Sequence, residues 1–122
     1  MNQPHKKAKE IELYGKFEVK SPKIDSKLSK ELASPIKLQN GETYLGSIQD
    51  NKRYGIGRCV WPDGSVYEGE WKNDRFEGQG RMIFKEGDFY TGDFIDGKAT
   101  GFGVYESTDG TVYKGEMYKD QF

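Results

Sequence analysis

The sequence is poor in the residues from which metal and nucleophilic sites are most often built. Cys59 is the only cysteine and His5 the only histidine among 122 residues. A single cysteine excludes an intramolecular disulfide and favours a reducing compartment. With one residue of each kind, and with His5 in a segment that we expect to be disordered, neither a cysteine–histidine zinc site nor a Cys–His dyad can be assembled. We therefore expect neither metal nor cofactor.

Long apolar runs are also missing. No stretch approaches the roughly 18 apolar residues of a membrane-spanning helix, and the N-terminus lacks the apolar segment of a secretion signal. Hydrophobic residues make up only 34% of the chain, and mean hydropathy is −0.91. These values predict a soluble cytoplasmic protein, or one that is peripheral to a membrane, with a thin aliphatic core.

A positive charge excess is absent from the part of the chain richest in aromatic residues. Residues 1–39 hold nine lysines and five acidic residues, a net charge of +4, whereas residues 40–122 hold ten basic and fifteen acidic residues, a net charge of −5. Nucleic-acid-binding domains are normally basic, and single-strand platforms place aromatics beside a positive groove. We therefore expect no nucleic-acid ligand.

Glycine and aromatic residues are abundant, and they recur with a fixed period of 23 residues. Aromatic residues make up 14% of the sequence, and there are 16 glycines, more than the usual share of about 7%. Four places after each repeated tyrosine stands a large apolar residue, which in the two central units is aromatic. The candidate aromatic row for structure or partner binding is Tyr44, Tyr67, Trp71, Tyr90, Phe94 and Tyr113. The repeated glycines are Gly46, Gly55, Gly57, Gly64, Gly69, Gly78, Gly80, Gly87, Gly92, Gly101, Gly103, Gly110 and Gly115.

Each period has the pattern of a β-hairpin. The dipeptides "DG" at 63–64 and 109–110 and "NG" at 40–41 favour tight hairpin turns, and a longer polar connection is expected over 72–77. Two strands per unit predict about seven antiparallel strands between residues 42 and 117. We expect an all-β fold: an elongated, single-layer antiparallel meander of tandem hairpins with a short N-terminal strand or helix cap.

The register across the "DG" turns stays open between two alternatives. A two-residue turn pairs Tyr67 with Val60, whereas a bulged turn places it opposite Cys59 and aligns the glycine rows. In either case Tyr67, Gly69 and Trp71 share one face of the strand. A glycine between two rings leaves space for an aromatic side chain from a neighbouring strand.

The run "YEGEWKNDRFEGQG", followed by "EG", resembles the MORN repeat. The resemblance covers residues 40–122 in three full units and part of a fourth; it departs from the pattern where Ile48 and Met117 replace the aromatic and Ser107 stands at the position of Trp61 and Phe84. It implies a hairpin-repeat fold. Proteins with this repeat are structural or assembly elements at membranes, cytoskeleton and cilia, or parts of lipid kinases.

The first 39 residues do not follow the period. We expect a disordered basic tail over 1–10 and an N-terminal extension over 11–39, whose patterns favour a strand at 11–19 and a short amphipathic helix at 25–33. The extension is expected to cap the first repeat, and the alternative is a basic arm for an acidic partner or an anionic membrane. The repeat array occupies 40–122.

No arrangement in the sequence points to catalysis. The paired glycines lack the helix and third glycine of a nucleotide-binding loop. The recurring carboxylates Glu70, Asp93 and Glu116 are interpreted as a solvated face, and Arg58 and Arg81 as partners of neighbouring acids. We expect no catalytic residue and no small-molecule substrate.

The favoured function is a non-catalytic scaffold that presents aromatic rows and an open sheet edge to a protein partner, with self-association at that edge as one form. A cytoskeletal, ciliary or membrane-associated assembly is the setting implied by the resemblance. The alternatives are a phosphoinositide- or membrane-binding module, which the array's negative charge disfavours, and the regulatory region of a larger enzyme such as a phosphatidylinositol phosphate kinase, with the chain truncated at Phe122.

Overall fold

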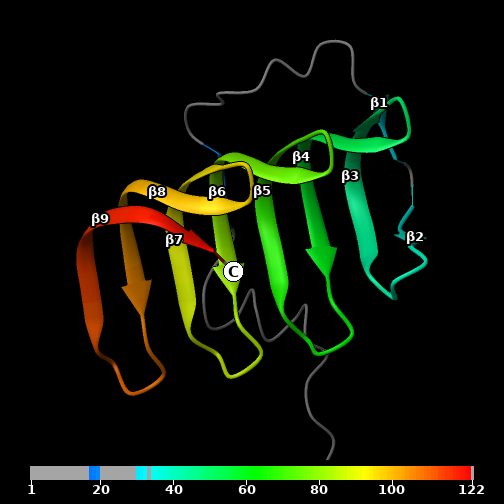
Figure 1. The fold of residues 1–122 in the computed structure, drawn as a ribbon. Helices are drawn as coiled ribbons and strands as arrows, with labels where there is room; N and C mark the ends of the chain where they lie inside the picture. The colour runs from blue at the N-terminus through cyan, green and yellow to red at the C-terminus, as the bar shows by residue number, and fades with distance from the viewer. Residues whose placement is uncertain (1–16, 20–29, 33, 122) are drawn as a thin grey trace, which may run out of the picture.

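The protein is described by a computed structural model, which defines residues 17–19, 30–32 and 34–121 (Figure 1). In this part of the chain all regular structure is β-strand: β1 (Lys30–Glu31), β2 (Ile36–Lys37), β3 (Thr43–Gln49), β4 (Lys52–Val60), β5 (Val66–Lys72), β6 (Arg75–Ile83), β7 (Phe89–Ile95), β8 (Lys98–Glu106) and β9 (Val112–Gln121). The strands form one antiparallel sheet in the order β1-β3-β4-β5-β6-β7-β8-β9, and β2 also pairs with β3. The predicted all-β meander is confirmed, and β3 to β9 are its seven repeat strands.

The sheet is bent along a line that crosses the strands, so that it has two arms (Figure 1). The bend lies where the register shifts within each repeat hairpin, between Gly46 and Ile48 in the first unit and between Gly69 and Trp71 in the second. A bulge of this kind bends a strand and increases its twist. We call the side within the bend the inner face and the opposite side the outer face.

The hairpins close at one end of the sheet through three-residue loops. Trp61 and Ser65 close the first such loop, the Gly64 N–H donates to the Trp61 carbonyl at 2.9 Å, and Gly64 has φ +96°. This geometry brings Cys59 opposite Tyr67 and Gly57 opposite Gly69. The bulged turn is therefore the correct one of the two register alternatives, because a glycine with positive φ adds one residue to the loop.

At the other end of the sheet, the hairpins close through two-residue turns. The connection expected over 72–77 is wrong in length, because Lys72 and Arg75 already pair and leave only Asn73 and Asp74 between them. Both turn residues have positive φ, +49° and +69°. Asn and Asp tolerate this conformation better than other residues with side chains, so the polar composition that suggested a long loop makes a tight turn.

The N-terminal extension differs from its expected structure where it is described. Lys30 and Glu31, within the predicted helix, form strand β1, which pairs with Ser47 and Ile48 of β3. The helix is wrong at these two residues, because their main chain pairs with the edge of β3. The remainder of the 25–33 range, the tail over 1–10 and most of the predicted 11–19 strand lie outside the described residues. Residues 17–19 of that range are described and do not form a strand.

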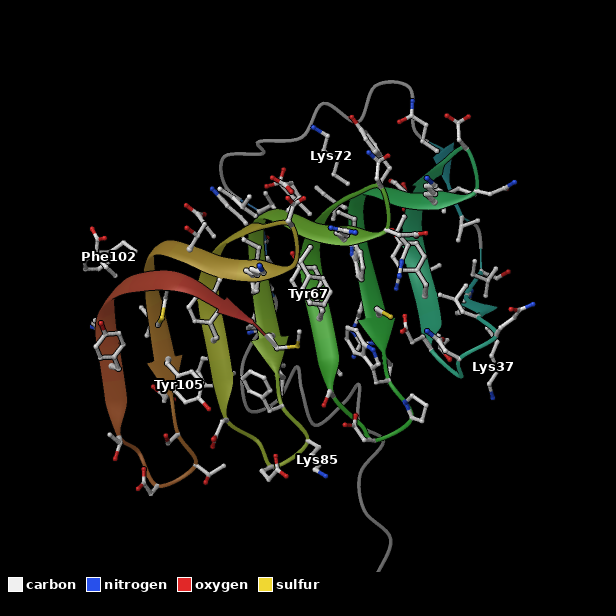
Figure 2. All side chains as sticks on the ribbon, viewed as in Figure 1. Lys37, Tyr67, Lys72, Lys85, Phe102 and Tyr105 are labelled. Atoms are coloured by element: carbon white, nitrogen blue, oxygen red, sulfur yellow. The ribbon has the colours of Figure 1, made fainter. Side chains whose placement is uncertain are left out.

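The core lies on the inner face and is predominantly aromatic. Tyr67 contacts Trp71 of its own unit and Phe94 of the next unit, with ring centroids 5.0 and 5.3 Å apart and nearly perpendicular ring planes. Edge-to-face pairs of this type contribute roughly 0.5–1.5 kcal/mol beyond area burial. Tyr67 lies at the centre of the inner face, whereas Phe102 projects away from the sheet (Figure 2). The buried cluster comprises Tyr44, Cys59, Tyr67, Trp71, Met82, Tyr90, Phe94, Ala99 and Met117.

Candidate functional site

The repeated tyrosines and glycines form one packing arrangement. Tyr67 lies over Gly69 and Gly80, and its hydroxyl donates a 2.8 Å hydrogen bond to the carbonyl of Glu70 on the same strand. A Cβ atom on Gly80 would overlap the Tyr67 ring and hydroxyl. The ring above Gly69 thus comes from its own strand, and the expected neighbouring-strand aromatic is wrong for that position. The expectation is correct for Gly80 on β6, which lies under the Tyr67 ring of the neighbouring strand β5.

Most residues of the predicted aromatic row have no surface to offer a partner. Tyr44, Tyr67, Trp71, Tyr90 and Phe94 are at most 1% exposed, because each is covered by side chains of its own and adjacent units. Tyr113 is 51% exposed and has no equivalent unit beyond it in the described residues. A role of the row in partner binding stays a prediction, and only Tyr113 is accessible for it.

On the inner face, a pair of partly buried aromatic side chains, Trp61 and Phe76, lies beside the buried row. Both side chains are partly buried, and their ring centroids are 5.8 Å apart at an interplanar angle of 84°. Trp61 closes the loop after β4, and Phe76 lies on β6 opposite Trp71. Sequence reasoning missed this pair, because the two residues occupy different positions within their repeats. Trp61 lies 17 residues after Tyr44, whereas Phe76 lies nine residues after Tyr67. Only the bend of the sheet brings the two offsets together.

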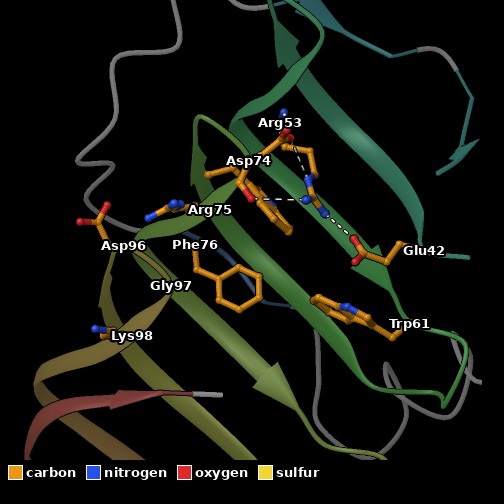
Figure 3. Close-up of a pocket in the computed structure, with 10 residues that line it drawn as sticks. Glu42, Arg53, Trp61, Asp74, Arg75, Phe76, Asp96, Gly97 and Lys98 are labelled. Carbon is orange, nitrogen blue, oxygen red and sulfur yellow. Dashed lines mark hydrogen bonds and ion pairs between the residues drawn. The ribbon is translucent and has the colours of Figure 1, made fainter. Parts of the chain in front are cut away.

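Two hollows on the inner face share this aromatic pair. The larger has a volume of about 550 Å³, and its aromatic lining residues are Trp61, Trp71 and Phe76; Trp61 and Phe76 are labelled in Figure 3. The smaller has a volume of about 210 Å³ and extends from the same two rings toward the three-residue loop. Residues lining the larger hollow are Glu42, Arg53, Trp61, Trp71, Asp74, Arg75, Phe76, Asp96, Gly97 and Lys98. Those lining the smaller are Trp61, Asp63, Ser65, Phe76 and Met82.

An ion-pair network holds one wall of the larger hollow. The Arg53 guanidinium lies 2.6 Å from the Glu42 carboxylate and 3.1 Å from that of Asp74 (Figure 3). It also lies over the Trp71 ring, 4.4 Å from the centroid. Burial lowers the pKa of Arg53, but the hydrogen bonds to both carboxylates outweigh it and raise the pKa overall. Arg53 thus occupies the position that Phe76 fills one unit later, and it is held by two acids and a ring.

The same network surrounds Cys59 and makes its thiol unreactive. The Cys59 sulfur lies 3.4 Å from a Glu42 oxygen and 3.5 Å from an Arg53 nitrogen. Burial, followed by the charge of Glu42, raises the pKa of the thiol to about 12. A thiol protonated at neutral pH is a poor nucleophile, so its environment gives Cys59 the role of a packed sheet residue.

The recurring carboxylates do not share one environment. Glu70 is fully buried, and its carboxylate accepts a 2.7 Å hydrogen bond from the backbone N–H of Gln79 at the bulge. The expectation of a solvated row is therefore wrong for Glu70, because the carboxylate fills the space beside Gly78. Asp93 is partly buried and Glu116 is exposed, so only the last unit fits the prediction.

The arginine row on the outer face pairs with acids as predicted. Arg58 lies 3.1 Å from Glu68, and Arg81 lies 3.8 Å from the same carboxylate on the strand between them. The Arg81 guanidinium also lies over the Phe17 ring, 5.6 Å from its centroid. Phe17 of the N-terminal extension therefore contacts the outer face.

In the part of the chain that the structure describes, no three or more His, Cys, Asp or Glu side chains are grouped so as to hold a metal ion. The described residues also contain no helix long and apolar enough to span a bilayer.

Comparison with known proteins places the repeats in a family. Residues 44–66, 67–89 and 90–112 each match the MORN repeat, which covers more than half of the chain. A phosphatidylinositol 4-phosphate 5-kinase 1 from Oryza sativa subsp. japonica is 40% identical over 43 residues, which amounts to 35% of this chain and 5% of the kinase. The similarity thus covers only a small part of that enzyme. The three consecutive matches coincide with the three hairpins of the sheet, and the chain belongs to the MORN-repeat family.

Proposed function

We propose that this protein is a non-catalytic interaction module whose inner face binds a segment of a protein partner. The observation that carries the proposal is the Trp61–Phe76 pair, which two adjoining hollows share. Tryptophan and other large aromatic residues supply a large share of the energy at binding hot spots. The setting proposed for the module is a cytoplasmic assembly at the cytoskeleton, a cilium or a membrane.

The rigidity of the aromatic layer supports this function. The Phe76 ring stacks on Tyr67 with centroids 4.1 Å apart and an interplanar angle of 15°, and it contacts Trp71 and Phe94 at 5.1 and 5.6 Å. A side chain already fixed in its bound position loses little entropy on association. The inner face thus offers a partner a surface that does not have to be ordered first.

The test is affinity capture from cells of the source organism with the full chain as bait. A Trp61→Ala bait is expected to lose a specifically captured protein, whereas a Phe84→Ala bait is expected to retain it. Phe84 occupies the same place in the second unit as Trp61 in the first, but it lines neither hollow. Equal capture by the wild-type and Trp61→Ala baits would contradict the proposal that the inner face binds the partner.

A second mode of association is supported by the last strand. β9 pairs with β8 on one side, while no described strand pairs with its other side. Tyr113 and Val112 on this strand are 51% and 44% exposed. An edge of this kind promotes strand addition, including self-association. Light scattering over a concentration series should show association, and a strict monomer at the highest concentration would contradict it.

Phosphoinositide binding is a second candidate function, favoured by the similarity to the plant kinase. Arg75 and Lys98 on the rim of the larger hollow could contact phosphate groups. The net charge of −5 over residues 40–122 opposes attraction to an anionic surface. Sedimentation with phosphatidylcholine vesicles, with and without phosphatidylinositol 4-phosphate, tests this function, with Arg75→Glu/Lys98→Glu as the variant. Absence of lipid-dependent sedimentation at low and high salt would exclude it.

A further inference from the structure

The inner face restricts the backbone conformation of any segment bound there. Strands β4, β5 and β6 are paired on both sides, within the series β3 to β7, and their N–H and C=O groups are used in these ladders, so a ligand crossing the inner face cannot add to the sheet as a further strand. Its own backbone groups must be satisfied internally, as in a helix, or by water and a few side chains, as in a polyproline II segment.

The lining of the larger hollow disfavours a helix. Amphipathic helices dock an apolar stripe of several turns into a continuous hydrophobic groove. Here, six of the ten lining residues are charged: Glu42, Arg53, Asp74, Arg75, Asp96 and Lys98. Burying an apolar helix face against these groups would remove water from charges without replacing it. The apolar surface is confined to the aromatic lining residues, which suits a narrow ligand in a groove that stays hydrated at its sides.

Trp61 has the features of a residue that receives such a ligand. Its ring is partly exposed and meets Phe76 nearly at a right angle, so the two rings separate two adjacent hollows. The indole N–H of Trp71 donates to the Gly57 carbonyl at 3.0 Å. The indole N–H of Trp61, by contrast, donates no hydrogen bond to the residues that the structure describes. It is therefore available to a ligand carbonyl, while the rings contact the ligand's side chains.

The two edges of the sheet, one formed by the three-residue loops and the other by the two-residue turns, differ in the sign of their net charge. The loops with their closing residues, at 38–42, 61–65, 84–88 and 107–111, hold five acidic residues and one lysine. The two-residue turns with their closing residues, at 49–52, 72–75 and 95–98, hold three acidic and four basic residues. Asp63 is the single charged residue among the described residues that line the smaller hollow. The acidic loop edge, with Asp63 in the smaller hollow, thus attracts a ligand that carries basic residues.

We infer that the Trp61–Phe76 site binds a proline-rich segment in the polyproline II conformation, with an arginine or lysine beside Asp63. Proline rings would occupy the two hollows on either side of the aromatic pair, and a ligand carbonyl would accept the Trp61 indole N–H. Polyproline II segments dock in aromatic-lined grooves because they are already extended and lose little entropy on binding. This inference rests on the proposed function, since it names the class of partner segment for the same site.

The experiment uses the full chain and a synthetic peptide, Arg-Pro-Pro-Ala-Pro-Pro-Ala, with the two matched peptides in which alanine replaces proline or glutamate replaces arginine. Binding is followed by two-dimensional NMR of the indole N–H signals, of which the chain has two. The peptide is expected to shift the Trp61 signal saturably and to leave the Trp71 signal, held by Gly57, nearly unchanged. The peptide in which alanine replaces proline is expected to bind at least about tenfold more weakly, because its extended form is not preorganised.

Variants of the protein separate the contributions of ring and charge. Trp61→Ala is expected to weaken binding by about 30-fold, as for a hot-spot aromatic, while Phe84→Ala leaves it unchanged. Asp63→Asn is expected to weaken binding roughly two- to fivefold, which is the range measured for the loss of an exposed ion pair. Asn40 already makes in the first loop the backbone bond that Asp63 makes in the second, so this substitution retains the turn. Asp109→Asn, the same change in the last loop, is the control.

The outcomes distinguish this inference from the proposed function. Equal binding of the proline and alanine peptides, or no shift of the Trp61 signal at any peptide concentration, overturns the proline-rich ligand. An amphipathic helical peptide that shifts the Trp61 signal more strongly overturns it as well. If a partner is nevertheless captured in a Trp61-dependent manner, the interaction function stands without this ligand. If neither peptide nor partner depends on Trp61, both proposals fail.

Discussion

Tyrosine and glycine form a single functional unit at the scale of the residue. Tyr44, Tyr67 and Tyr90 each lie over a glycine pair, and Tyr113 lies over Gly115. Each of these tyrosines donates its hydroxyl to the carbonyl three residues further along its own strand, as Tyr44 does to Ser47 at 2.6 Å and Tyr113 to Glu116 at 3.1 Å. The glycines are required because any side chain at their positions would occupy the space of the ring. The sequence period showed that these residues belong together, and the hydrogen bond explains why the residue is tyrosine.

Removing one hydroxyl tests this arrangement. Tyr67→Phe is expected to lower the free energy of unfolding by about 1–2 kcal/mol, because the buried carbonyl of Glu70 loses its donor. Tyr113→Phe removes the equivalent bond at a half-exposed site, where water replaces it, and is expected to cost less than about 0.5 kcal/mol. Urea unfolding of both variants gives the comparison. Equal losses would show that burial does not set the strength of this bond.

Adding one methyl group tests the role of the glycine. Gly80→Ala is expected to destabilise the protein by about 1–3 kcal/mol, since its Cβ overlaps the Tyr67 ring. The control is Gly110→Ala, where φ is +90° but nothing lies within 4 Å of the added atom, so that only backbone strain of about 1 kcal/mol is expected. Thermal unfolding measures both. A smaller loss for Gly80→Ala than for Gly110→Ala would contradict the packing explanation.

Ionisation of buried groups predicts how stability depends on pH. Burial raises the pKa of the Cys59 thiol from 9.0 to about 12, and burial raises that of Tyr67 well above 10.0. A folded-state pKa above the unfolded value means that stability is intact below pH 9 and is lost as the pH rises from 9 toward 12. The urea midpoint should therefore fall over this range, and it should fall less in Cys59→Ala. An unchanged midpoint up to about pH 11 would exclude this linkage.

At the scale of the element, the tight turns connect neighbouring hairpins. The Asp74 N–H donates to the Arg53 carbonyl at 3.0 Å, and its carboxylate accepts the Arg53 backbone N–H at 2.8 Å. One unit later, the Gly97 N–H donates to the Phe76 carbonyl at 3.0 Å. The turns thus stack along one edge of the bent sheet and hold one wall of the larger hollow.

Two substitutions of one turn residue separate its contributions. Asp74→Ala is expected to cost about 2–3 kcal/mol, because it removes the bonds to Arg53 and places alanine at φ +69°. Asp74→Gly removes the same bonds, but glycine adopts this φ freely, so its cost should be smaller by about 1 kcal/mol. Urea unfolding of the two variants measures the difference. If Asp74→Gly proved the less stable, the backbone strain assigned to this position would be wrong.

At the scale of the whole molecule, the array is least covered at its last strands. Three of the large hydrophobic side chains exposed in the described residues lie on β8 and β9: Phe102, Val112 and Tyr113. The edge of β3, by contrast, is paired with β1 and β2. In a repeat array, each unit is stabilised by its neighbours, so a terminal unit with one neighbour opens first.

Hydrogen exchange should show this gradient along the chain. Amides of β5 and β6 are expected to be the slowest to exchange, because strands lie on both sides and Tyr67 and Trp71 cover them. Amides of β9 are expected to exchange at least about tenfold faster, the ratio for an opening free energy lower by about 1.4 kcal/mol. Uniform protection across all strands would indicate that the sheet opens as one cooperative unit.

The sequence by itself determined the 23-residue period, the all-β fold, the seven repeat strands and the identity of the structural tyrosines and glycines. These features are local or repeated, so the same residue pattern for them recurs in each unit of the sequence. The tertiary structure decided the bulged register at Cys59 and Tyr67, the burial of Glu70, and the meeting of Trp61 with Phe76. These features depend on the bend at the bulges, which brings together residues from different positions of different units. The 23-residue period shows which residues are equivalent, but it does not show that residues at non-equivalent positions, such as Trp61 and Phe76, are in contact.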